Sequence, residues 1–348
     1  MKSMVDITNV DELREFMTEP TEGLVGMMSK LEGDIVVLGG DGKVGPELVE
    51  TLIKADRLAG TKRDIMVPSL YITDAAKATQ AYFENELGVK TFVGDLSDQA
   101  FLDSLPEAAN VIYMVGFKFG SAADPGKTIL MNCIVPGMVA MKYNRSRVVN
   151  WSSGNPYPHT DPADGGCKED AVLEPQGIYG YSIVGREMAW NVSASGHQEQ
   201  KICHYRLMYA QHLGYGVLVD LARMINTGER ISLEMPYVNL ISQRDAIDRS
   251  LRGLEVASNP SRVFNVSGPY YNVREICLKL AAVLGKDPIF ATEEADTALI
   301  ANDSFCVERF GPYRDQWEDM ILAAANWVKA GGEYWNLPTK FGSADHVY

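Results

Sequence analysis

Residues 34–56 read DIVVLGGDGKVGPELVETLIKAD, and this stretch decides the fold. Residues 35–39 form an apolar run typical of a short buried strand. After a glycine-rich turn, apolar residues recur at the spacing of one helix face, at Val44, Leu48, Val49, Leu52 and Ile53. We therefore expect a strand, a tight turn and an amphipathic helix in immediate succession.

The turn places Gly39, Gly42 and Gly45 three residues apart. In dinucleotide-binding folds the first such glycine allows the tight turn, the second lets the backbone approach a pyrophosphate, and the third lets the helix pack close to the sheet. The phosphate then meets free N–H groups and the positive end of the helix dipole. Outside this context three glycines would indicate only a turn. Here they predict a dinucleotide site, with Lys43 and Val44 among its contacts.

Strand and helix patterns alternate beyond this stretch. Further strands are expected at residues 65–67, 90–94, 110–116, 147–151 and 202–208, and helices at residues 75–87, 131–143 and 179–191. Such alternation is typical of an α/β fold with a doubly wound parallel sheet, the Rossmann arrangement. A smaller C-terminal α/β lobe is expected to follow.

Three segments are expected to form the domains. Residues 1–33 are a helical extension, residues 34–208 the dinucleotide-binding domain, and residues 209–335 mainly a substrate-binding lobe. The chain is expected to return to the sheet around residues 237–268, where a further strand pattern occurs.

Polar segments follow several of the predicted strands. Ligands of such sheets bind outside the carboxyl ends of the strands. This rule brings together the glycine turn, Asp95 and Leu96, residues 115–118 and residues 152–157. The sequence therefore predicts one site at this edge, with Val115 and Gly116 in the cofactor contact.

Composition argues against several other functions. The formal net charge of −14 makes nucleic acid and anionic membrane surfaces unfavourable partners. The five cysteines and five histidines are scattered, so neither disulfides nor a metal site is expected. No apolar run is long enough to span a membrane, and acidic residues interrupt the N-terminus, unlike a signal peptide. We expect a cytoplasmic location.

The end of the second strand normally selects between NAD and NADP, through an acid or an arginine respectively. Residues 68–71 carry neither, and Asp64 lies at the other end of the strand. Because no arginine follows, NAD is the expected cofactor, and NADP stays open as the alternative.

Taken together, these segments resemble the extended short-chain dehydrogenase/reductases, the NAD-dependent epimerase/dehydratase group, over residues 34–330. Asp95-Leu96 is similar to the family's adenine-contacting pair. Residues 116–120, GFKFG, are similar to a loop of UDP-galactose 4-epimerases, which implies that Lys118 contacts the cofactor ribose or phosphate. Asn132 takes the place of a structural asparagine.

The resemblance also implies the catalytic residues. Ser153 takes the serine position, and Tyr179 begins YGYSIVGRE, which is similar to the tyrosine–lysine helix of the family. The lysine of that pattern is replaced by Ile183. A free tyrosine has a pKa of about 10, and a nearby positive charge is needed to bring it toward working pH. Lys118 replaces that charge, or the substrate has an easier proton, or the protein binds cofactor without catalysis.

Other polar residues at this edge have lesser expected roles. Asn155 and Tyr209 are expected to contact substrate, and Arg206 lies at the same edge. Arg186 and Glu187 are expected to form a structural or interface pair.

Two functions follow. The first is an NAD(P)-dependent oxidoreductase or epimerase acting on a hydroxyl or keto carbon of a sugar or sugar derivative, with Ser153, Tyr179 and Lys118 as its catalytic groups. The alternative is a non-catalytic NAD(P)-binding sensor of the NmrA-like type. The resemblance further implies a homodimer, formed through helices near residues 131–143 and 179–191.

Overall fold

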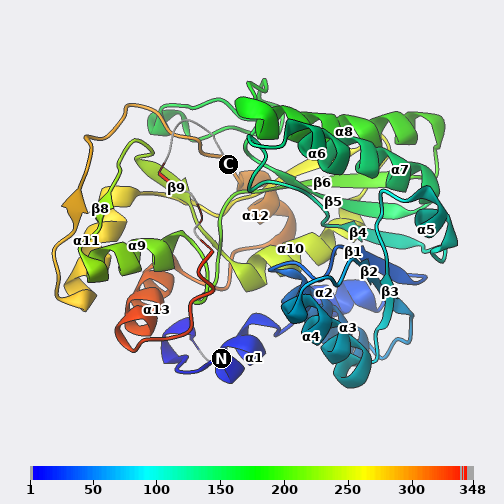
Figure 1. Cartoon of the computed structure of the whole chain (residues 1–348), viewed down its shortest axis with the longest axis horizontal. Coiled ribbons are helices and arrows are strands. Elements are labelled where there is room, and N and C mark those ends of the chain that lie inside the picture. Colours follow the sequence, from blue (N-terminus) through cyan, green and yellow to red (C-terminus); the bar gives the residue numbers. More distant parts are fainter. Residues whose placement is uncertain (1–2, 338, 340, 343–348) are drawn as a thin grey trace.

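A computed structural model describes residues 3–337, 339 and 341–342. A seven-stranded parallel sheet has the order β11-β6-β5-β4-β1-β2-β3. This order reverses direction between β1 and β4, as in doubly wound sheets. The carboxyl ends of the strands face a second lobe (Figure 1). No helix in the described part of the chain has the length and apolar character needed to cross a membrane.

Short elements alternate along the chain. The strands are β1 Ile35–Leu38, β2 Ile65–Ser69, β3 Lys90–Val93, β4 Asn110–Tyr113, β5 Arg147–Ser153, β6 Lys201–Leu207, β7 Ala210–Gln211, β8 Arg230–Ile231, β9 Tyr237–Asn239, β10 Ile241–Ser242, β11 Arg262–Val266, β12 Tyr270–Asn272 and β13 Ile289–Phe290. The α-helices are α1 Val10–Met17, α2 Glu22–Met28, α3 Gly45–Leu58, α4 Asp74–Tyr82, α5 Gln99–Ser104, α6 Pro125–Ile129, α7 Val135–Lys142, α8 Gly177–Gly196, α9 Val217–Thr227, α10 Gln243–Val256, α11 Val273–Leu284, α12 Ser304–Phe310 and α13 Trp317–Lys329. Two π-helical segments, Phe83–Leu87 and Leu130–Ile134, continue α4 and join α6 to α7.

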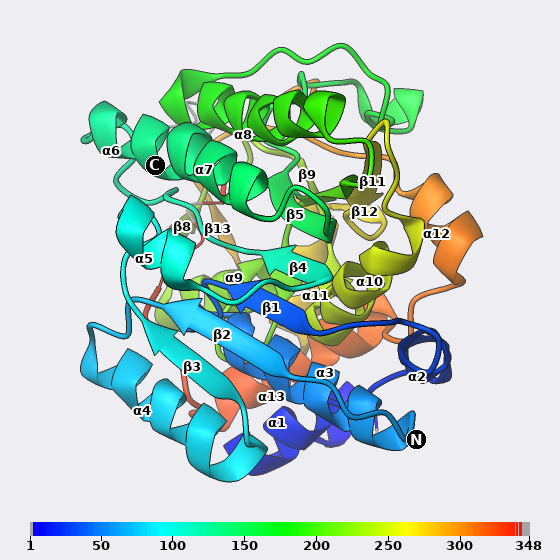
Figure 2. The same cartoon turned by 90° about the vertical axis from the view of Figure 1, so that its right-hand side faces the viewer.

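Strand β1 is buried on both faces, and its residues alternate between two cores. Ile35 and Val37 pack on one side with α2, α3 and α10. Val36 and Leu38 pack on the other side with α5, α7 and α8. Figure 2 shows these helices covering the two faces of the sheet. Burial on both faces is what the uninterrupted apolar run predicted.

The second lobe has its own core. Helices α9, α11 and α13 pack against one another, and their apolar faces form one buried cluster. The N-terminal extension connects this lobe to the sheet. Leu13 and Phe16 of α1 belong to the core of the second lobe, whereas Leu24 and Met28 of α2 belong to the core of the sheet.

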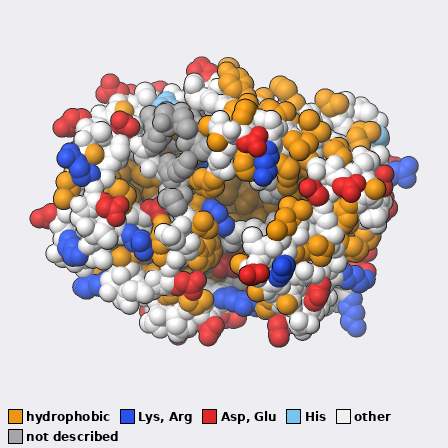
Figure 3. Space-filling model, in the orientation of Figure 1, with side chains coloured by type: hydrophobic (Ala, Val, Ile, Leu, Met, Phe, Trp, Pro, Cys, Tyr) orange, Lys and Arg blue, Asp and Glu red, His pale blue; other side chains and the backbone are white. Residues whose placement is uncertain are grey.

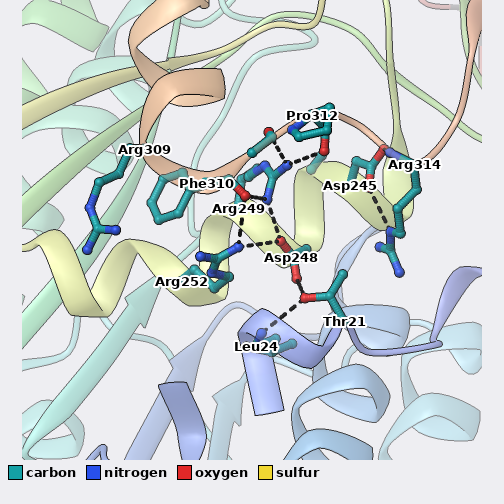
Figure 4. Close-up of polar contacts among 12 residues, drawn as sticks. Thr21, Leu24, Asp245, Asp248, Arg249, Arg252, Arg309, Phe310, Pro312 and Arg314 are labelled. Carbon is teal, nitrogen blue, oxygen red and sulfur yellow. Dashed lines mark hydrogen bonds and ion pairs between the residues drawn. The ribbon is translucent and has the colours of Figure 1, made fainter. Parts of the chain in front are cut away.

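Buried charges on α10 hold the extension and a C-terminal segment in place (Figure 4). Asp248 accepts a hydrogen bond from the hydroxyl of Thr21, the residue that caps α2. Arg249 donates to Asp248 and to the backbone oxygens of residues 310–312. Asp245 accepts hydrogen bonds from both the backbone and the side chain of Arg314. One helix therefore anchors two segments that are far apart in the sequence, the start of α2 and residues 310–314.

Several element boundaries differ from the prediction: β4 ends at Tyr113 rather than at residue 116, β5 runs on to Ser153, and α8 is longer at both ends than residues 179–191. Two further differences have a clear physical cause. Strand β2 continues through Pro68 instead of ending there, because Pro68 takes part in the sheet through its carbonyl, which accepts from the N–H of Gly39 at 3.2 Å. The helical segment expected at residues 131–143 begins earlier, at Pro125, where Asp124 caps it through the N–H of Lys127. Proline at the first position of a helix costs no hydrogen bond.

Candidate active site

The glycine turn is built as tightly as its sequence predicts. Gly39 has a φ of +81°, a conformation that residues with a Cβ rarely adopt. A Cβ on Gly45 would lie 2.0 Å from the carbonyl oxygen of Gly40, so only glycine lets α3 start this close to the turn. A Cβ on Gly42 would meet nothing nearer than 3.6 Å. Gly42 is therefore the position with room for a ligand beside it.

Helix α3 begins without a side-chain cap. Its N-cap residue, Val44, makes no side-chain hydrogen bond to the first turn, and its side chain packs against the core of the sheet. The backbone N–H groups of that turn are thus the groups suited to an anion. Lys43 points toward the second lobe, with its Nζ 4.0 Å from the ring centre of Tyr215 and 4.7 Å from that of Phe119.

A cleft of about 330 Å³ opens at the carboxyl ends of β1, β2, β3 and β4. Six of the residues predicted to contact the cofactor line it: Gly39, Gly42, Asp95, Leu96, Val115 and Gly116. The sequence reasoning did not include Asp41, Ser69 and Lys127, which also line this cleft. Figure 3 shows the surface hollowed between the sheet and the second lobe, with hydrophobic side chains on the walls.

The loop after β4 is held in place by Asn132, which lies in the π-helical segment. Its side chain accepts from the N–H of Phe117 and donates to the carbonyl of Phe117, both at 2.8 Å. Arg186 donates to the same Asn132 oxygen at 2.7 Å. This clamp fixes the residue before Lys118. The Nζ of Lys118 lies 5.3 Å from the ring centre of Tyr179.

Ser153 and Tyr179 come together although they lie on different elements. Ser153 ends β5, and Tyr179 lies in the first turn of α8. Burial raises the pKa of Tyr179, while the positive charge of Arg186 and a hydrogen bond with Ser153 lower it, with burial the larger effect. The Ser153 hydroxyl donates to the side-chain oxygen of Asn155 at 2.9 Å. Tyr181, two residues further along α8, is 61% exposed.

Ile183 occupies the helix turn after Tyr179. Its side chain is fully buried and packs against Tyr179. The contact at this position is therefore apolar and brings no charge to the phenol. Burial, and the repulsion of Lys43, lower the pKa of Lys118 to about 8. Burial also lowers the pKa of Lys43. Two cationic side chains with lowered pKa values thus lie near the glycine turn and the tyrosine.

Arg186 and Glu187 do not pair with each other. Glu187 forms a buried ion pair with Arg206, with 2.7 Å between Oε2 and Nη2, and accepts from Ser152 at 2.6 Å. Arg206 lies at the edge where the sequence predicts the site, but this ion pair and the Tyr157 hydroxyl, 2.7 Å from its Nη1, fix its side chain inside the protein.

Tyr209 follows the end of β6. Its ring packs edge-on against Phe341, with ring centres 5.8 Å apart, beside the core of the second lobe.

Asp41 is the most notable residue that the sequence reasoning missed. An acid that selects the cofactor is expected at the end of β2, whereas Asp41 lies in the glycine turn. Its side chain reaches the end of β2, where the Ser69 hydroxyl and the N–H of Tyr71 donate to it. A charged residue inside a glycine motif was the signal available in the sequence.

The sequence matches the model of one known protein family. The model of the NAD dependent epimerase/dehydratase family matches residues 35–248, more than half of the chain. No curated protein matches the sequence.

Solved structures also match. Similar ones include a UDP-glucose 4-epimerase from Thermotoga maritima with UDP-glucose (17% identity, TM-score 0.68) and a UDP-N-acetylglucosamine 4-epimerase from Methanobrevibacter ruminantium in complex with UDP-N-acetylmuramic acid (17%, 0.69). A third is a UDP-glucuronic acid 4-epimerase from Bacillus cereus in complex with UDP-glucuronic acid and NAD (14%, 0.67). Each match covers 86% of this chain and 99% of the other. At these identities the likeness shows the fold.

Proposed function

This chain belongs to the NAD dependent epimerase/dehydratase family, and from that premise we propose that it is an NAD-dependent oxidoreductase or epimerase. Its substrate is a sugar or sugar derivative that reacts at a hydroxyl or keto carbon. The cofactor is held by residues 34–208, together with residues 237–268, where the chain returns to the sheet. The substrate is held mainly by residues 209–335.

The shape of the glycine turn supports a bound dinucleotide. A Cβ on Gly45 would lie 2.0 Å from the carbonyl oxygen of Gly40, so only glycine lets α3 start this close to the turn, and the helix N-terminus carries no side-chain cap. Gly42 leaves room beside that N-terminus. The pyrophosphate would be held there by backbone N–H groups. Leu96 and Val115 offer apolar contact to the adenosine end of the same cleft.

The pairing of Ser153 with Tyr179 is the observation that supports catalysis most directly. Ser153 orients the substrate oxygen, and the Tyr179 hydroxyl exchanges a proton with it. Because burial holds the pKa of Tyr179 above its ordinary value, the phenol is protonated at neutral pH and needs positive charge to act as a base. Lys118 supplies that charge. A bound nicotinamide supplies the hydride acceptor or donor.

A sugar substrate is supported by the solved structures that share this fold, several of which are epimerases of UDP-sugars. The alternative, a sensor without catalysis, is favoured by Ile183 in place of a lysine. It does not account for the contact between Ser153 and Tyr179, which a binding module does not need.

The test is an NADH fluorescence titration followed by a substrate screen. The purified chain is expected to bind NADH and to turn over at least one member of a panel of UDP-sugars, free sugars, sugar acids and polyols. Binding of NADH with no turnover across the panel would favour the sensor. Absence of NADH binding would refute the proposal altogether.

We also propose a homodimer formed by the helices α7 and α8 in the cytoplasm. Large apolar side chains are exposed along this edge, among them Ile134 (52%), Met141 (54%), Met188 (60%) and Val192 (72%). Figure 3 shows hydrophobic side chains gathered there. A second copy of the same face would cover them. The five unpaired cysteines agree with a reducing compartment.

A further inference from the structure

We propose that Asp41 binds the adenosine ribose hydroxyl groups of the dinucleotide and selects NAD over NADP. This inference rests on the proposed function, since it concerns how the same cleft recognises its cofactor. In dinucleotide-binding folds an acid at the end of the second strand normally has this role. In this chain the end of β2 carries Ser69, Leu70 and Tyr71, and none of them is charged.

The fold supplies the carboxylate from the neighbouring loop instead. Asp41 lies between Gly40 and Gly42, and its Oδ1 accepts a hydrogen bond from the Ser69 hydroxyl. Its Oδ2 accepts from the N–H of Tyr71 at 3.3 Å. Two donors from the end of β2 therefore hold the acid at the place where that strand lacks one.

The turn after β2 is shaped to make these contacts. Tyr71 has a φ of +46°, which is uncommon for a residue with a side chain. Its hydroxyl donates to the carbonyl of Val67 at 3.0 Å, so the chain folds back over the end of the strand. This conformation aims the N–H of Tyr71 at Asp41. The contacts also keep the carboxylate directed toward β2 and away from the uncapped start of α3. A carboxylate at the start of α3 would repel a pyrophosphate bound there.

Asp41 lies in the cleft itself. It lines the cavity of about 330 Å³ together with Ser69, Gly42 and the predicted adenine contacts Asp95 and Leu96. The ribose lies between the adenine and the pyrophosphate in a dinucleotide, and Asp41 lines the same cleft as the residues expected to hold those two groups.

The chemistry of a carboxylate fits this choice. Its two oxygens offer about four acceptor positions, of which Ser69 and Tyr71 use two, so the others can accept from ribose hydroxyls. Hydrogen bonds to a charged acceptor are stronger than those between neutral groups. A 2′-phosphate would instead bring negative charge against the carboxylate.

Two other charged residues line the cleft. Asp95 accepts from the N–H and the hydroxyl of Ser97, both at 2.8 Å, in the turn after β3. Lys127 lies over the ring of Phe117, with its Nζ 4.8 Å from the ring centre, in the segment after β4. Both follow other strands, which leaves Asp41 as the charge placed at the end of β2.

The test compares NADH and NADPH binding to the same protein samples by fluorescence titration. Asp41→Asn keeps the size of the side chain and removes the charge, and Asp41→Ser removes the carboxylate altogether. The wild type is expected to bind NADH at least about tenfold more tightly than NADPH. In both variants the dissociation constant for NADPH divided by that for NADH should fall by about 10- to 100-fold. This is the effect of losing a hydrogen bond to a charged group. Because both ligands are titrated into one sample, a partly unfolded fraction cancels from the ratio.

Asp74→Asn is the matched control, since it removes the same charge from an exposed position at the start of α4. It should keep the wild-type ratio. A ratio within about threefold of the wild-type ratio in both Asp41 variants would overturn this inference. The proposed function would stay intact as long as NADH still binds. A wild-type chain that binds neither dinucleotide would overturn both. As an independent measurement, an NADH analogue with a 2′-deoxyadenosine ribose should bind the wild type more weakly than NADH does, and Asp41→Ser should no longer distinguish the two.

Discussion

Replacing Lys118 with methionine removes the positive charge that lies beside the proposed acid–base group. The Nζ of Lys118 is 5.3 Å from the ring centre of Tyr179, and its loop is fixed by Asn132 through two hydrogen bonds to Phe117. The neighbouring helix position, Ile183, contributes only an apolar contact. The variant therefore tests whether Lys118 supplies the charge that Ile183 does not.

The size of the effect follows from the separation of the two groups. Two unit charges about 5 Å apart interact by about 3 kcal/mol at an effective dielectric constant of about 20. The cleft is open to water on one side, so we expect about 2 to 3 kcal/mol for the interaction of Lys118 with the Tyr179 phenolate. The Lys118→Met variant should then lose about 30- to 150-fold in kcat/KM. Lys118→Arg keeps the charge and should lose less than about tenfold.

The dependence on pH gives the more specific signature. The pKa of Lys118 is lowered to about 8, so the side chain is charged below that pH and loses its charge as the pH rises through it. The wild-type kcat/KM should therefore decline above about pH 8. Arginine stays protonated throughout this range, so Lys118→Arg should lack the decline. Lys118→Met should be low at every pH.

The assay is the steady-state rate on the substrate found in the screen, followed through the redox state of the nicotinamide or through the product. It is run from about pH 6 to about pH 9.5, around the pKa of the group tested. Lys77→Met is the control. It removes the same charge from an exposed position on α4, far from the tyrosine in sequence. A Lys118→Met enzyme with wild-type kcat/KM, within about threefold, and the wild-type decline at high pH would refute the reasoning.

Three further predictions concern the turn, the tyrosine and the dimer. Gly45→Ala should destabilise the protein by about 1 to 3 kcal/mol in thermal unfolding, because its methyl group would lie 2.0 Å from a backbone oxygen. In Gly42→Ala the added methyl group would lie 3.6 Å from its nearest neighbour, so this variant should unfold near the wild-type temperature but bind NADH more weakly. A destabilised Gly42→Ala beside a stable Gly45→Ala would contradict the assigned roles. Tyr179→Phe should abolish turnover while NADH affinity stays within about threefold, and unchanged turnover would exclude Tyr179 as the acid–base group. Met188→Glu should shift the protein from dimer to monomer in light scattering, whereas Leu278→Glu, at a similarly exposed position on α11, should not; two equal masses would argue against this interface.

Much of the fold could be predicted because buried strands and amphipathic helices leave regular patterns. The apolar stripe at Leu48, Val49, Leu52 and Ile53 is the buried face of α3, and the apolar run at residues 35–39 identified the central strand. Pro68 was misread because proline usually ends a strand, whereas here its carbonyl completes a sheet contact. The start at Pro125 was missed because a capping aspartate and a proline are weak signals beside an apolar stripe.

The site was predictable to the extent that strand ends gather at one edge of a parallel sheet. This rule brought Gly39, Asp95 and Gly116 into one cleft. It does not say which way a side chain points once it is there. Arg206 turns inward to pair with Glu187, and Asp41 reaches across to the end of another strand. Both orientations depend on partners from other elements, which the pattern of a single strand or turn does not reveal.

A crystal structure of the chain with bound NAD tests the central claim most directly. The account predicts the pyrophosphate at Gly42 and the start of α3, the adenosine ribose against Asp41, and the nicotinamide ring facing the hydroxyls of Ser153 and Tyr179. NAD bound at another place, or a nicotinamide ring turned away from those two hydroxyls, would contradict it.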